Sequence, residues 1–168
     1  MNAWREIRKA INNDEDPRFS MAQILKVAAM HRVTDTYGPI PYLNFGVSKE
    51  VPYDSQKDVY YRFFEELDGA INNLDSYAAS GSKVLSSWDC VFNGDVTSWI
   101  KFANSLRMRL AMRISAVDPD KARTEFLKGL ENEFGVFEAE DERVAVSTKS
   151  GFTNPLGELN RVWNETYM

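Results

Sequence analysis

The chain has 168 residues and a formal net charge of −5, with 43% hydrophobic and 27% charged residues. This composition is typical of a globular protein, and the length fits one domain of roughly 100–200 residues. The acidic balance argues against a nucleic-acid partner, and no apolar run reaches the roughly 18 residues that a membrane-spanning helix requires. We therefore expect a single domain over residues 1–168 that binds no nucleic acid.

Histidine and cysteine are scarce, since Cys90 and His31 are the only residues of their types. A structural zinc site takes about four Cys or His ligands. Nucleophilic catalysis by serine or cysteine usually needs a histidine base, so that chemistry would depend on His31 alone. The acidic run at residues 138–142 lacks the glycine and the spacing of an EF-hand calcium loop. We therefore expect no metal site, no cofactor and no enzymatic activity.

Apolar residues recur at intervals of three and four along most of the chain, a pattern typical of amphipathic helices. It predicts five helices: from the first residue through Ile11, over about 20–34, from Asp54 or Ser55 to just before Gly81, over about 97–117, and from Asp118 onward. Residues 143–147 suggest a short strand, and a last short helix is expected to begin at Asn154-Pro155.

Residues that favour helix starts accompany this pattern. Ser20 and Gln23 match a capping box, and Asp118 followed by Pro119 matches an N-cap with proline in the first turn. Successive helices joined in this way predict an all-α fold of paired antiparallel helices with long ordered loops, similar to a tetratricopeptide array.

The loop at residues 34–42 is the most distinctive irregular segment. Its two prolines and Gly38 predict a stiff turn. Tyr37 and Tyr42 in this loop either present their rings to a ligand or pack beneath the loop. Trp88 and Trp163, in or near other irregular stretches, are further candidates, because an indole offers a flat apolar face and one N–H donor. The alternative for both tryptophans is ordinary packing.

Three arginines crowd the helix predicted over 97–117. Arg109 and Arg113 are four residues apart and share a face. An anion clamp is one interpretation of these residues. Pairing with carboxylates inside the scaffold is the interpretation that we favour.

Three sequence blocks resemble the SusD/RagB family of nutrient-binding outer-membrane lipoproteins of Bacteroidetes. In that family an aspartate, an aromatic residue and Gly-Asp precede a Trp-x-x-Phe-Ala-Asn-Ser-Leu helix with repeated arginines. The matching residues here are Asp89, Phe92, Gly94-Asp95, Trp99, Phe102 to Leu106, Arg107, Arg109 and Arg113. The other blocks are 34–42, similar to the family's Thr-Asp-x-Tyr-Gly-x-Ile-Pro-Tyr loop, and 54–60 followed by 66–70.

The resemblance implies a tetratricopeptide-like scaffold and a non-enzymatic role at the cell surface. Family members capture glycans or other nutrients and pass them to a partner TonB-dependent transporter of the SusC type. Their ligand-specific residues vary with the nutrient, so Tyr37, Tyr42, Trp88 and Trp163 are predicted from aromatic chemistry alone. The alternative function is a helical-repeat adaptor that binds only protein.

Family members are also several times longer and carry an N-terminal lipid anchor on a cysteine. Cys90 lies in mid-chain before a helix and does not match that cysteine. We therefore expect the sequence to be a fragment of a longer cell-surface lipoprotein, attached to the outer membrane only through an anchor outside this sequence.

Overall fold

The computed structural model describes residues 1–48, 50–139, 142–146 and 162. Within them the chain forms the helices α1 (Asn2–Ile11), α2 (Pro17–Tyr37), α3 (Gln56–Ala79), α4 (Val96–Ile114) and α5 (Pro119–Leu130). The all-α prediction is confirmed. The last helix expected at Asn154-Pro155 lies outside the described residues.

Short polar side chains fix where the helices begin. Ser55, one of two predicted caps, accepts a hydrogen bond from the Asp58 amide, and Asp118 caps α5 as predicted, with Pro119 in the first turn. The capping box at Ser20 is wrong, because Asp16 caps α2 instead by accepting from the Arg18 amide at 2.8 Å. Pro17 then fills the first helical position, where the missing amide costs nothing.

Two predicted boundaries near the C-terminal half also change. α4 ends at Ile114 rather than near Val117, because the chain turns into the cap of α5 at Asp118. Residues 142–146 contain no strand, so the described part of the predicted strand at 143–147 is wrong. A strand needs a partner ladder, and none of the described residues pairs with this segment.

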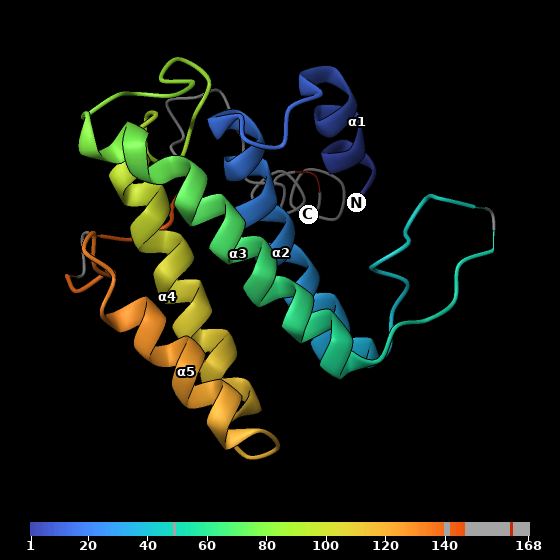
Figure 1. Cartoon of the computed structure of the whole chain (residues 1–168). Coiled ribbons are helices and arrows are strands. Elements are labelled where there is room, and N and C mark those ends of the chain that lie inside the picture. The colour runs from blue at the N-terminus through green and yellow to red at the C-terminus, as the bar shows by residue number, and fades with distance from the viewer. Residues whose placement is uncertain (49, 140–141, 147–161, 163–168) are drawn as a thin grey trace.

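The helices pack as antiparallel neighbours, α2 against α3 and α4 against α5, with α3 and α4 joining the two pairs (Figure 1). Apolar residues of α3 that are spaced three and four apart form the centre of the core, where Phe63, Leu67 and Leu74 are fully buried. Trp99 of α4 and His31 of α2 are also buried. None of the described helices is long and apolar enough to cross a membrane.

The two long connections leave α3 at opposite ends. Residues 38–55 precede α3 and project from one end of the helix array, and residues 80–95 follow α3 at the other end (Figure 1). We call these segments the 38–55 loop and the 80–95 loop. They carry Tyr42 and Trp88, two of the four aromatic residues selected from the sequence.

Candidate ligand-binding surface

The base of the 38–55 loop is tied together by backbone bonds. Ile40 and Asp54 exchange hydrogen bonds of 3.3 and 3.0 Å between their main chains. The Asp54 carboxylate also accepts from the amides of Tyr42 and Leu43, each at 2.8 Å. Gly38 adopts a φ of 75°, which permits the sharp exit from α2. These contacts close the loop into a defined shape.

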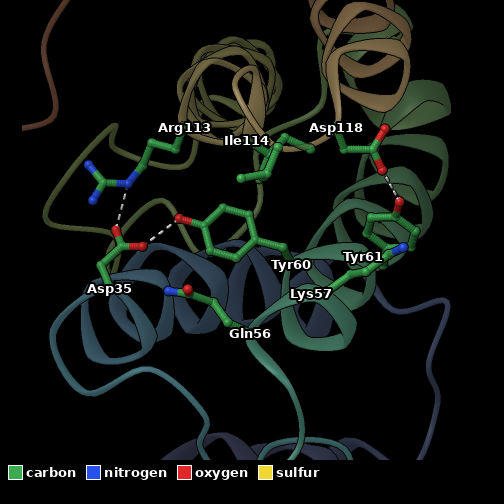
Figure 2. Close-up of a pocket in the computed structure, with 9 residues that line it drawn as sticks. Asp35, Gln56, Lys57, Tyr60, Tyr61, Arg113, Ile114 and Asp118 are labelled. Carbon is green, nitrogen blue, oxygen red and sulfur yellow. Dashed lines mark hydrogen bonds and ion pairs between the residues drawn. The ribbon is translucent and has the colours of Figure 1, made fainter.

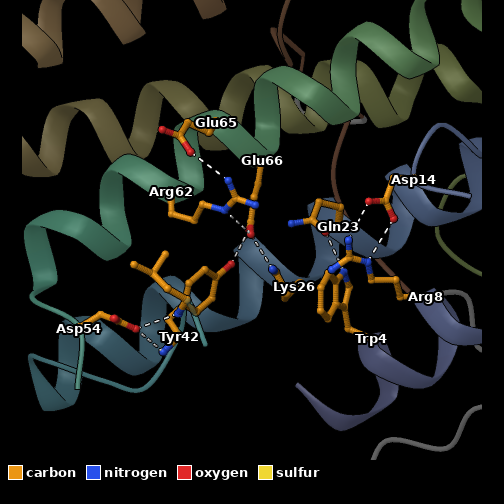
Figure 3. Close-up of polar contacts among 11 residues, drawn as sticks. Trp4, Arg8, Asp14, Gln23, Lys26, Tyr42, Asp54, Arg62, Glu65 and Glu66 are labelled. Carbon is orange, nitrogen blue, oxygen red and sulfur yellow. Dashed lines mark hydrogen bonds and ion pairs between the residues drawn. The ribbon is translucent and has the colours of Figure 1, made fainter. Parts of the chain in front are cut away.

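Tyr42 anchors this loop to the core and does not face solvent. Only 3% of Tyr42 is exposed, and its hydroxyl donates to Glu66 of α3 at 2.5 Å (Figure 3). Burial, with the nearby Glu66 carboxylate, raises the pKa of the Tyr42 phenol, so it stays protonated as the donor. Of the two alternatives for Tyr42, packing beneath the loop is the one observed. We therefore withdraw Tyr42 from the ligand-binding candidates.

Tyr37 and Tyr53 flank the same loop and are open to solvent. Tyr37, the last residue of α2, is 75% exposed, and Tyr53, just before α3, is 73% exposed. Sequence analysis selected Tyr37 and missed Tyr53. The signal for Tyr53 was its position directly after Pro52, in a segment rich in helix-breaking residues.

Trp88 is the most exposed tryptophan among the described residues, with 84% of its surface open. The next residue, Asp89, organises the 80–95 loop: its carboxylate accepts from the amides of Val91 and Gly94, each at 2.9 Å, and from the Trp99 indole at 2.8 Å. Burial raises the pKa of Asp89, but these donors outweigh burial and lower it overall. Trp88 is therefore exposed on a loop whose conformation is fixed by hydrogen bonds to the Asp89 carboxylate.

The predicted aromatic residues do not converge on one site. Tyr37 and Trp88 lie at opposite ends of α3, Tyr42 is buried, and Trp163 lies outside the described residues. The candidate surface thus consists of two separate aromatic positions, at the 38–55 loop and at the 80–95 loop.

Two of the three arginines of α4, Arg107 and Arg113, pair with carboxylates of the scaffold, as the favoured interpretation predicts. Arg107 is buried and donates to Asp68 of α3 at 2.5 Å, and Arg113 pairs with Asp35 of α2 at 2.8 Å. Each contact ties α4 to another helix. The described geometry therefore gives no support to an anion clamp made by these arginines together.

Comparison with known proteins places the chain in a family. A family model described as "SusD-like: Susd and RagB outer membrane lipoprotein" matches residues 1–168. The chain therefore belongs to the SusD-like family of outer-membrane lipoproteins. A search of the curated proteins found no match.

Solved structures agree with this assignment. A SusD homologue from Bacteroides vulgatus is 46% identical, with a TM-score of 0.76 over 85% of this chain and 29% of that one. A chitin-binding SusD homologue from Flavobacterium johnsoniae is 40% identical, with a TM-score of 0.80 over 88% of this chain and 31% of that one. A SusD-like protein from Bacteroides thetaiotaomicron is 32% identical, with a TM-score of 0.81 over 89% and 31%. The chain spans less than a third of each of these relatives.

Proposed function

We propose that the protein carrying this chain binds a glycan at the cell surface and delivers it to a SusC-like TonB-dependent transporter, without catalysing a reaction. Membership of an outer-membrane lipoprotein family supports the location, and a relative described as chitin-binding supports a glycan as the ligand class. The delivery step and the transporter partner are inferred from the family resemblance.

The exposure of Trp88 on the Asp89-organised loop is the observation that carries the proposal. A sugar ring has an apolar face of C–H groups and hydroxyls around its edge, so it matches an indole face and its N–H donor. The loop around Trp88 is already ordered by hydrogen bonds, so binding requires little further loss of conformational entropy. Tyr37 and Tyr53 offer two further rings at the other loop.

Calorimetric titration of the full-length protein tests glycan binding. Soluble chitin oligosaccharides are the first probes, followed by starch-, xylan- and mannan-derived oligosaccharides. We expect Trp88→Ala to weaken binding at least tenfold, a loss of about 1.4 kcal/mol, because it removes the exposed ring. Leu25→Ala is the matched control, because Leu25 is exposed on α2 away from both loops.

An affinity that Trp88→Ala leaves unchanged would remove Trp88 from the site. If the protein binds none of these glycans yet co-purifies with a transporter barrel, the adaptor function is favoured instead.

A further inference from the structure

A groove with a volume of about 650 Å³ opens where four helices end, separate from both exposed aromatic positions. The end of α2, the start of α3, the end of α4 and the start of α5 form its walls (Figure 2). This volume lies within the roughly 300–1,000 Å³ that small-molecule sites occupy. None of the exposed aromatic residues Tyr37, Tyr53 and Trp88 lines this groove.

One wall of the groove is a linked set of polar groups. The Tyr60 hydroxyl donates to Asp35 at 2.5 Å, and the other carboxylate oxygen of Asp35 pairs with Arg113 Nε at 2.8 Å. Burial raises the pKa of Tyr60 to about 12, which keeps the phenol a donor at neutral pH. Figure 2 shows the two terminal nitrogens of Arg113 directed away from Asp35, and nearly half of this side chain is exposed.

The opposite wall repeats the arrangement of tyrosine and aspartate. The Tyr61 hydroxyl donates to Asp118, which also caps α5, and the Lys57 ammonium lies 5.3 Å from the centre of the Tyr61 ring (Figure 2). Each carboxylate of the groove therefore already has a donor from the protein. A carboxylate has about four acceptor positions, so each can accept at least one more hydrogen bond.

The charges of the groove are balanced, and this restricts its ligand. Two carboxylates, Asp35 and Asp118, are matched by two cations, Lys57 and Arg113. A charged ligand group would meet one attractive and one repulsive partner and would have to compete with existing pairs. A hydroxyl both donates and accepts, so it can bind a carboxylate and a cation without breaking these pairs. Ile114 and Val117 add apolar surface for C–H groups.

We infer that this groove is a second binding site, selective for a short neutral saccharide, which contacts Asp35, Arg113 and Asp118 through its hydroxyls. The ligand class rests on the proposed glycan function, but the site is distinct from Trp88 and Tyr37. Asp35 lines the groove, whereas Tyr37 does not. Two residues correspond to about 200° of helical rotation, which places Tyr37 on the other side of α2.

Hydrogen–deuterium exchange on the full-length protein tests the inference. The probes are chitotriose, cellotriose, maltotriose and xylotriose, with trigalacturonate as an anionic control and trialanine as a zwitterionic one. We expect at least one neutral trisaccharide to slow exchange in peptides covering 112–121 and 54–61, and the two charged probes to leave them unchanged. Arg113→Gln should weaken this protection at least tenfold in apparent affinity, with protection at the two loops retained.

Matched variants separate binding from folding. Arg123→Gln removes the same charge from an exposed position on α5 outside the groove and should leave the protection unchanged. Tyr61→Phe keeps the ring but releases Asp118, and it should weaken binding less than Arg113→Gln. The melting temperature of each variant is measured alongside, so that a loss of binding in a folded Arg113→Gln protein supports the site.

Three results would overturn the inference. Saccharide protection at the 38–55 or 80–95 loop alone would leave the proposed function standing and reject the groove. Protection of the groove by trialanine or trigalacturonate but not by a neutral sugar would assign it to a charged ligand. No protection by any saccharide, at the groove or at either loop, would count against both the groove and glycan capture.

Discussion

Two buried ion clusters of similar composition hold the helices together, and they differ in how fully their polar atoms are paired. The α2–α3 cluster consists of Lys26, Glu66 and Tyr42. Lys26 Nζ donates to Glu66 Oε1 at 2.7 Å, and the Tyr42 hydroxyl donates to the other oxygen at 2.5 Å. Lys26 also lies 4.0 Å from the centre of the Trp4 ring, which is a favourable position for a cation (Figure 3).

The α4–α5 cluster consists of Arg107, Glu125 and Asp68, with Lys121 and Lys128 at its edge. Arg107 donates to Asp68, but its nearest approach to Glu125 is 3.6 Å. Within the described structure, Arg107 Nε and Glu125 Oε2 are buried without a hydrogen-bond partner. The other carboxylate oxygen, Glu125 Oε1, accepts hydrogen bonds from Lys121 Nζ at 2.8 Å and from Lys128 Nζ at 3.4 Å.

A buried ion pair repays the cost of desolvation only where its geometry is good and its remaining polar atoms are also hydrogen-bonded, so the two clusters differ in how well they meet this condition. In the α2–α3 cluster a single glutamate satisfies two buried partners, so the cluster depends on Glu66. In the α4–α5 cluster Glu125 has three cations around it, so the loss of any one leaves others. The two clusters should therefore respond differently when each loses one buried charged partner, Glu66 in the first and Arg107 in the second.

The largest effect is expected for Glu66→Leu. This change keeps the side-chain volume similar but leaves Lys26 and the Tyr42 hydroxyl buried without an acceptor. Removing one partner of a buried ion pair costs about 3–5 kcal/mol, and we expect the free energy of unfolding, measured with urea, to fall by that amount. Glu65→Leu, on an exposed neighbour, is the control and should change stability by less than about 0.5 kcal/mol.

Arg107→Met should cost less, about 2–3 kcal/mol, because Lys121 and Lys128 continue to pair with Glu125. The measurement is the same urea titration. A loss equal to or greater than that of Glu66→Leu would show that the two clusters are equivalent, and the comparison would not hold.

Tyr42→Phe sharpens the comparison by removing a single hydrogen bond from the α2–α3 cluster. A buried hydrogen bond to a charged group is worth about 1.5–3 kcal/mol, and the ring contacts of Tyr42 remain. We expect a loss of that size, together with faster hydrogen exchange in the 38–55 loop, which Tyr42 anchors. Unchanged exchange in this loop would mean that the Asp54 contacts hold it without Tyr42.

The smallest effect concerns acid stability of the α4–α5 cluster. Burial raises the pKa of Asp68, but Arg107 and Lys128 outweigh it and hold the pKa below 3.8. The stabilisation that Asp68 provides is present above the unfolded pKa of 3.8 and is lost as pH falls through the lower folded value. More than a third of this side chain is exposed, so the contribution is less than about 1 kcal/mol.

Unfolding of wild type and Asp68→Asn between pH 6 and pH 2 measures this contribution. We expect the two proteins to differ in stability at pH 6 and to converge as pH falls well below 3.8. A constant difference across the range would show that Asp68 acts through packing rather than through its charge.

The helices follow from local chemistry and were therefore predictable. The three- and four-residue spacing of apolar residues identified the buried face of α3, and Ser55 and Asp118 cap their helices through amides only three residues away. The cap predicted at Ser20 was wrong because a second local pattern, Asp16 followed by Pro17, also favours a helix start, and α2 begins there.

Whether each of the selected aromatic residues is exposed or buried was not predictable from local sequence. Tyr37 and Tyr42 are five residues apart in the sequence, yet one is exposed at the end of α2 and the other is buried in the 38–55 loop. What buries Tyr42 is its acceptor on Glu66, 24 residues later, and that contact exists only once α2 and α3 have packed. Likewise, the groove joins the ends of four helices, which no local sequence pattern brings together.

The length of α3 has a consequence for the kind of ligand that the protein would favour. With 24 residues at about 1.5 Å each, α3 is roughly 36 Å long, and Tyr37 and Trp88 lie beyond its opposite ends. A short oligosaccharide reaches one position, whereas a polymer chain can reach both. Once one end is bound, the second contact becomes intramolecular, so its effective concentration rises and avidity exceeds either single affinity. Two weak contacts at this spacing would therefore select for long chains over their fragments.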